Sequence, residues 1–127
     1  MRAIILVLAC LLSAATFAAP PPAPFSADYA VYQDGQPIGT GRITLRRLPD
    51  GRWEMVTRSE ATQGVAALAG VRREETSVIA WGDAGPQSLS YDMRQKAAWN
   101  ERRETLRVDP TRRTATATYK NESRDLP

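Results

Sequence analysis

The side chains of this sequence that could carry catalysis are four glutamates, Glu74, Glu75, Glu101 and Glu104. Two carboxyl groups that flank a scissile bond are the machinery of a glycoside hydrolase. Nothing in the spacing fixes such a pair across a cleft, and each glutamate has arginine neighbours in the chain. Cross-strand ion pairs on a solvated sheet face are therefore the favoured interpretation. A carboxylate-based hydrolase is the least favoured function.

Nucleophilic and metal chemistry have few candidates. The sequence contains no histidine and a single cysteine, Cys10. Ser59 and Ser77 therefore have no histidine to activate them, and Lys96 and Lys120 occupy positions where we expect exposure. The same absences remove the usual zinc ligands, and there is no regular Asp/Asn/Gly loop of the calcium-binding type. We expect a non-enzymatic protein with no metal or other cofactor.

The N-terminus has the pattern of a secretory signal peptide. A short positive start at Met1-Arg2 precedes an apolar run over residues 3–12 and a small-residue segment that ends at Ala18. The apolar run is shorter than the roughly 20 residues of a membrane-spanning helix, so we expect a signal helix over residues 1–18 and no transmembrane span in the mature form. Cys10 would be lost with the signal, and a lipid-anchor interpretation of it is disfavoured. The predicted location is the periplasm.

The balance of charged residues bears on whether the protein binds nucleic acid. There are 17 Lys and Arg against 14 Asp and Glu, a formal net charge of +3. Nucleic-acid binding requires a strongly basic surface, whereas two of the four arginine pairs here have acidic residues directly beside them. We therefore expect no nucleic-acid partner.

After a proline-rich leader over residues 19–24, the chain alternates apolar and polar side chains in segments that end at turn sequences. The pattern predicts an all-β domain over residues 25–120, an antiparallel meander that forms a curved, partly open sheet or half-barrel with one short helical segment. Gly39 and Gly41 fall on an apolar face, where they leave room for a large aromatic side chain. Trp99 differs in parity from Leu106 and Val108, which predicts a bulge or bend between them.

The C-terminal residues bear on whether the predicted sheet is complete in this sequence. Residues 121–127 read as a trailing segment that leaves the last strand at an open edge. Strongly apolar residues are also few for a sheet of this size. We expect either a C-terminally incomplete chain or a partner that completes the fold.

The helical segment lies within residues 62–70, where two glycines enclose an apolar run. Val65, Leu68 and Val71 recur at three-residue spacing, which predicts a short helix with one apolar side. We expect this helix either to cap one end of the sheet, which is the favoured interpretation, or to lie across the sheet as a lid over an apolar ligand. Tryptophans commonly anchor a small core, but they also line pockets. The candidate ligand-binding residues are Val65, Leu68, Trp53, Tyr91 and Trp99.

The sequence resembles bacterial exported proteins grouped as domain of unknown function 3108. The resemblance covers about residues 25–120, and its motifs are structural ones: Phe25-x-Ala27-x-Tyr29-x-Val31-Tyr32, Gly35-x-Pro37-Ile38-Gly39, the Trp53 strand, Ala61-Thr62-x-Gly64, Glu74-Glu75-Thr76, and Tyr91 through Gln95-Lys96 and Trp99. It implies a periplasmic, β-rich protein of unestablished role. Its sheet would be similar in outline to the half-barrels of lipoprotein carriers, and relatives usually carry further strands.

From these observations we expect a non-enzymatic exported protein that binds an apolar ligand, such as a lipid, or another envelope component on one sheet face. The alternative is a structural or interaction module that pairs with an envelope protein through an edge strand.

Overall fold

The computed structural model describes residues 19–120 and 122–126. The predicted signal helix, its cleavage site and Cys10 lie outside these residues. Within them, no helix has both the length and the apolar character needed to cross a membrane.

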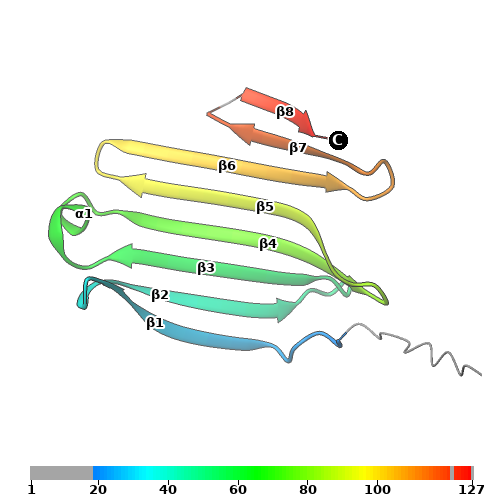
Figure 1. The fold of residues 1–127 in the computed structure, drawn as a ribbon, viewed down its shortest axis with the longest axis horizontal. Helices are drawn as coiled ribbons and strands as arrows, with labels where there is room; N and C mark the ends of the chain where they lie inside the picture. Colours follow the sequence, from blue (N-terminus) through cyan, green and yellow to red (C-terminus); the bar gives the residue numbers. More distant parts are fainter. Residues whose placement is uncertain (1–18, 121, 127) are drawn as a thin grey trace, which may run out of the picture.

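The described chain forms one open, eight-stranded antiparallel sheet in which every strand pairs with its neighbour in sequence (Figure 1). One short helix, α1 (Gly64–Leu68), interrupts the meander between the third and fourth strands. The strands are β1 (Phe25–Gln33), β2 (Gln36–Arg47), β3 (Trp53–Ala61), β4 (Arg72–Gly82), β5 (Gly85–Ala97), β6 (Asn100–Asp109), β7 (Thr114–Tyr119) and β8 (Glu122–Leu126). The predicted antiparallel β fold is confirmed.

Strand β8 differs from the prediction, which placed a trailing segment over residues 121–127. This strand pairs with β7 along its whole length, from Ala115↔Leu126 to Tyr119↔Glu122. The Thr116 hydroxyl donates to the Asp125 carboxylate at 2.7 Å, and the Thr118 and Ser123 hydroxyls are 3.0 Å apart. These contacts join β8 to β7, although its sequence lacks the alternation of apolar and polar residues from which a strand is normally predicted.

The register places unlike side chains on the two faces of the sheet, because successive residues of a strand point to opposite sides. We call one side the apolar face. It carries Phe25, Tyr29, Val31, Ile43, Leu45, Trp53, Met55, Ile79, Tyr91, Met93, Leu106 and Tyr119. We call the other side the charged face. It carries Asp28, Arg42, Arg46, Glu54, Arg58, Glu60, Arg72, Glu74, Asp92, Arg94, Lys96, Glu101, Arg103 and Arg107.

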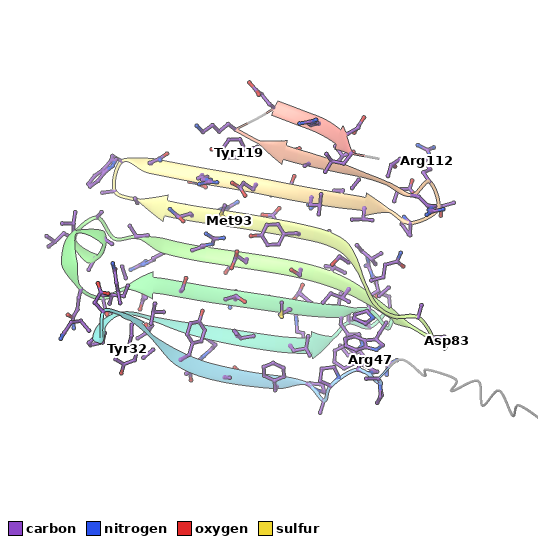
Figure 2. All side chains as sticks on the ribbon, in the orientation of Figure 1. Tyr32, Arg47, Asp83, Met93, Arg112 and Tyr119 are labelled. Carbon is purple, nitrogen blue, oxygen red and sulfur yellow. The ribbon has the colours of Figure 1, made fainter. Side chains whose placement is uncertain are left out.

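The buried side chains of the sheet lie on the apolar face. Met93 is 1% exposed and lies between Glu75 of β4 and Glu104 of β6, whose side chains flank it. Leu45 and Trp53 are also buried. Because a single sheet has no second layer to pack against, its core consists of side chains that cover one another along this face (Figure 2).

The predicted pairing of a glycine with an aromatic ring is confirmed at Gly41. Tyr29 lies opposite Gly41 in the β1–β2 register, and a Cβ built on Gly41 would be 2.2 Å from Cζ of Tyr29. The ring therefore rests on the glycine backbone. At Gly39 the close neighbour is instead the backbone carbonyl oxygen of Glu60, 2.6 Å from such a Cβ.

Helix α1 forms where the sequence predicts it, but it covers neither face of the sheet. It buries none of its residues, and Val65 and Leu68 are 78% and 89% exposed. The helix lies beyond the ends of β3 and β4 (Figure 1), so its apolar side chains have no sheet surface beneath them. The buried residue is Ala69, whose carbonyl accepts a hydrogen bond from the Ala98 N–H at 2.7 Å. The position of the helix at one end of the sheet fits the cap interpretation and not the lid, but the expected packing of Val65 and Leu68 as core residues is wrong.

The irregularity expected near Trp99 is also placed differently. Trp99 lies in the turn between β5 and β6 and is 77% exposed, so its parity says nothing about the strand that follows. The β5–β6 register runs without a shift from Ala97↔Asn100 to Ser90↔Arg107. A bulge occurs instead between β4 and β5, where Leu89 is the unpaired residue.

The proline-rich leader runs back to the sheet. The indole Nε1–H of Trp81 in β4 donates to the carbonyl oxygen of Ala19 at 2.9 Å. Since β1 begins at Phe25, the intervening residues reach from the β1 edge to β4 at one end of the sheet.

Candidate functional site: a hollow on the apolar face

The apolar face presents large side chains to solvent. Phe25 in β1 and Tyr119 in β7 are 45% and 43% exposed. In the described part of the chain, one sheet and one five-residue helix at its end are the only regular elements, so no second layer covers this face. Exposed apolar surface of this kind marks sites of interaction with ligands or partners.

A hollow of about 390 Å3 opens on this face over β5, β6 and β7. We call it the tyrosine hollow, and its apolar lining is Tyr91, Leu106, Ala117 and Tyr119. The register explains its position, since Tyr91, Leu106 and Ala117 lie side by side in one row across the three strands. The small Ala117 side chain leaves space beside Tyr119, two residues further along β7. The volume lies within the range of about 300–1,000 Å3 typical of small-molecule sites.

A hydrogen-bonded cluster fixes the Tyr91 side of the hollow. The Tyr91 hydroxyl donates to Oε1 of Glu75 at 2.6 Å, and the Arg73 guanidinium contacts the same oxygen at 2.6 Å. Partial burial disfavours the ionised form of Glu75, but the hydrogen bonds from Tyr91 and Arg73 outweigh it and keep the Glu75 pKa below its usual value. Burial, together with the bond to Glu75, raises the pKa of Tyr91. Glu75 is therefore ionised and Tyr91 neutral near pH 7.

A second ion pair borders the hollow on the β6 side. Arg102 forms hydrogen bonds with Glu104, and its guanidinium carbon lies 5.1 Å from the centre of the Tyr119 ring. The Lys120 ammonium is 5.3 Å from the same ring. Such cation–π contacts orient an aromatic side chain without covering its whole face. Tyr119 is thus held in place while part of its ring stays accessible.

The structure divides the five predicted ligand-binding residues into two groups. Trp53 and Tyr91 lie on the apolar face, but Trp53 pairs with Ile79 and Tyr91 with Ser77, so they occupy different rows. The other three, Val65, Leu68 and Trp99, are exposed at one end of the sheet. Of the five, only Tyr91 lines the tyrosine hollow.

Sequence reasoning did not select Leu106, Ala117 and Tyr119 as site residues. A signal was present, because Ala117 and Tyr119 share parity in the predicted seventh strand. Nothing local indicates, however, that this strand face adjoins Tyr91.

The four candidate glutamates are separated by the sheet. Glu74 and Glu101 lie on the charged face, whereas Glu75 and Glu104 lie on the apolar face with Met93 between them. Each has a basic partner. The expected cross-strand pairing is found for Glu74, which meets Arg58 at 2.5 Å, and for Glu101, which meets Arg94 at 3.4 Å. Glu75 and Glu104 pair instead with Arg73 and Arg102 of their own strands. A general acid needs a raised pKa, the opposite of what Glu75 has.

Residues 19–120 and 122–126 contain no group of three or more His, Cys, Asp or Glu side chains able to hold a metal ion. Comparison with known proteins adds no assignment, and the resemblance to domain of unknown function 3108 stays a prediction from the sequence motifs. No family model, curated protein or solved structure matches this chain.

Proposed function

We propose that this protein is exported to the periplasm and binds an apolar ligand or another envelope component on the apolar face of its sheet, without catalysing a reaction. The observation that carries the proposal is the tyrosine hollow on a face that has no covering layer in the described chain. Export is supported by the signal-peptide pattern of residues 1–18.

The lining supports an elongated apolar ligand, such as an acyl chain. The row formed by Tyr91, Leu106 and Ala117 supplies the apolar part of the lining, and Leu106 and Ala117 offer no polar side-chain group. The hydroxyl of Tyr91 and the Arg102–Glu104 pair, which also line the hollow, already have partners, because Tyr91 is bonded to Glu75 and Arg102 to Glu104. A polar ligand would have to displace these bonds, whereas an apolar ligand gains free energy from removing surface from water.

A titration with Nile red, a neutral apolar dye, and with a dansyl-labelled fatty acid tests the proposal on the mature protein. We expect saturable fluorescence enhancement. Ala117→Asp places a carboxylate in the apolar row of the hollow, where an apolar ligand would desolvate it. We expect this variant to weaken binding by about tenfold or more, equivalent to about 1.4 kcal/mol.

The matched control is Ala30→Asp. Ala30 lies in β1 on the side of the charged face, opposite Thr40, and is exposed. This variant introduces the same charge into a strand without approaching the hollow, so it should bind as the unmodified protein does. Absence of saturable binding, or equal effects of the two variants at unchanged circular dichroism, would exclude the tyrosine hollow as the site.

The alternative, pairing through an edge strand, is favoured by one observation at β1. This strand has nine residues and a single charged side chain, Asp28, which is engaged by Arg42. At the opposite edge, β8 has three charged residues, of the kind that discourage edge pairing. Crosslinking of the mature protein should then recover oligomers that Ala30→Lys abolishes, and recovery of monomer alone argues against self-association through this edge.

A further inference from the structure

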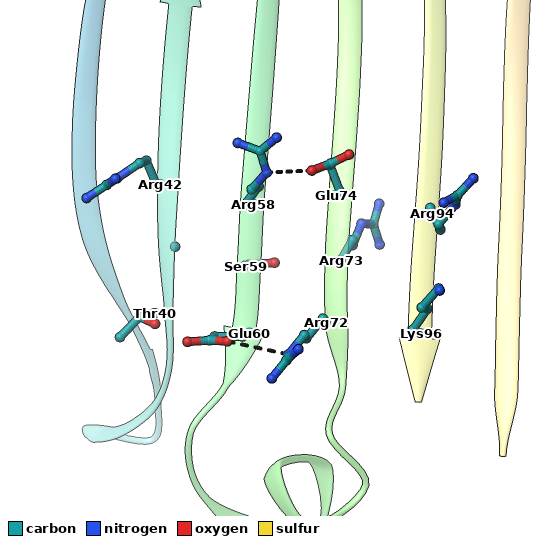
Figure 3. Close-up of a pocket in the computed structure, with 11 residues that line it drawn as sticks. Thr40, Arg42, Arg58, Ser59, Glu60, Arg72, Arg73, Glu74, Arg94 and Lys96 are labelled. Atoms are coloured by element: carbon teal, nitrogen blue, oxygen red, sulfur yellow. Dashed lines mark hydrogen bonds and ion pairs between the residues drawn. The ribbon is translucent and has the colours of Figure 1, made fainter. Parts of the chain in front are cut away.

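The charged face contains a groove of about 500 Å3, the larger of the two hollows described on this sheet. Its lining crosses β2 to β5 (Figure 3). The side chains that the charged face contributes are Thr40, Arg42, Arg58, Glu60, Arg72, Glu74, Arg94 and Lys96. Five are cations and two are anions, so the groove is basic although the whole protein is nearly balanced.

The register sets like charges directly opposite one another. Arg42 pairs with Arg58, and Arg72 pairs with Lys96. Just beyond the groove, Arg94 pairs with Arg103. Like charges in directly opposed positions destabilise a sheet. A negative ligand that bridges them would remove this repulsion.

The cations of the groove differ in how closely they are paired with acidic side chains of the protein. Arg42 makes two hydrogen bonds to Asp28, at 2.6 and 3.0 Å, and holds the pKa of that carboxyl below its usual value. Arg58 donates to Glu74 at 2.5 Å. These two side chains already have strong partners.

Three other cations of the groove have only distant acidic partners. We call these residues, Arg72, Arg94 and Lys96, the basic triad. Arg72 is 3.6 Å from Glu60, while Arg94 and Lys96 share Glu101 at 3.4 and 3.5 Å. None of these contacts meets hydrogen-bond geometry in the described chain. In Figure 3, the triad lies on the neighbouring strands β4 and β5. Its N–H groups are therefore available to an external acceptor.

We propose that the basic triad binds a small phosphomonoester. A dianionic phosphate has several acceptor oxygens to receive donors from three cations at once, and guanidinium groups match its geometry. The surrounding charges favour a small ligand over a membrane surface or a polyanion, because the cations Arg42, Arg46 and Arg103 on the same face are already paired with Asp28, Glu54 and Asp92 and offer little to an extended negative partner. This site is on the opposite side of the sheet from the tyrosine hollow and does not depend on the function proposed above.

Titration of the mature protein with inorganic phosphate and with glycerol phosphate, followed by NMR of the backbone amides, tests this proposal. We expect saturable shifts confined to β4 and β5. Arg94→Gln and Lys96→Gln should each weaken binding by about tenfold, the loss expected for one charge-assisted hydrogen bond. Added salt should weaken it as well, since the triad is exposed.

The Glu101→Gln variant gives the most specific test, because it is expected to increase the affinity for phosphate. The Glu101 carboxylate competes for Arg94 and Lys96, so its neutralisation should tighten phosphate binding, whereas a purely structural role would not produce a gain. Arg112→Gln is the matched control, because Arg112 follows the β6 strand and contacts Asp109 away from the groove. It should leave the affinity unchanged.

Three results would overturn the proposal: no saturable response to either phosphate, equal affinity in all variants, or weaker binding by Glu101→Gln. A parallel arm uses vesicles of phosphatidylcholine with and without phosphatidylglycerol. Binding to the anionic vesicles without binding to glycerol phosphate would assign the groove to a membrane surface and would also refute the phosphomonoester site.

Discussion

The contact between Tyr29 and Gly41 allows a quantitative test of how β1 is held on the sheet. A methyl group added at Gly41 would lie 2.2 Å from Cζ and 2.4 Å from the hydroxyl oxygen of Tyr29, whereas carbon atoms in contact are about 3.5–4.0 Å apart. Gly41→Ala therefore forces the ring off the sheet. Overpacking costs about 1–3 kcal/mol. Because Tyr29 is on an edge strand and can turn aside, we expect a loss of about 1–2 kcal/mol in the free energy of unfolding.

A double-mutant cycle separates this clash from the general effect of replacing glycine. Without the ring, alanine should be the better strand residue by about 0.5–1 kcal/mol, so Gly41→Ala should stabilise the Tyr29→Ala variant. Gly82→Ala is the matched control, since a Cβ at Gly82 of β4 would meet no atom within 4 Å. The assay is urea unfolding followed by tryptophan fluorescence and circular dichroism. Equal costs of Gly41→Ala with and without Tyr29 would refute the packing of the Tyr29 ring on the Gly41 backbone.

Three further outcomes are expected. Met93→Ala should cost about 2–5 kcal/mol in urea unfolding, because this side chain is 1% exposed and its removal leaves a cavity; a loss below 1 kcal/mol, on the order of a surface change, would contradict its burial. Leu68→Ser should change stability by less than about 0.5 kcal/mol, since Leu68 is 89% exposed, and a larger loss would show that α1 packs after all. The lowered pKa of Glu75 stabilises the fold above the usual carboxyl pKa of 4.5, and this contribution is lost as the pH falls through the folded-state value. Glu75→Gln should therefore flatten the acid limb of stability against pH, as should Tyr91→Phe, and an unchanged limb in both would refute the cluster.

Much of the fold is predictable from local patterns. The strand over Trp53–Ala61 follows directly from alternation after the turn Pro49-Asp50-Gly51, and the short helix follows from the run between Gly64 and Gly70. The strand and the helix both depend on residues adjacent in the chain, whose backbone preferences follow from their side-chain types. The ion pairs of Glu75 and Glu104 likewise involve arginines two residues away in the chain, whereas the partners of Glu74 and Glu101 lie on adjacent strands.

The wrong predictions concern segments whose position depends on distant partners. Strand β8 has little apolar alternation and forms because its polar side chains find partners on β7. Leu68 has the spacing of a core residue, but the helix that carries it extends past the sheet. Trp99 belongs to a turn, so its parity carries no information about the strand that follows it.

By itself, the sequence determined the alternation of strands and turns, and hence that one side of an antiparallel sheet is apolar and the other charged. The tertiary structure decided which side chains share a row across strands. Tyr91, Leu106 and Ala117 line one hollow only through the registers of the β5–β6 and β6–β7 hairpins, and Arg72 lies opposite Lys96 only through the register of the β4–β5 hairpin. A shift of one residue in any hairpin would move these side chains to the other face, so both candidate sites arise from register, which no short segment of sequence specifies.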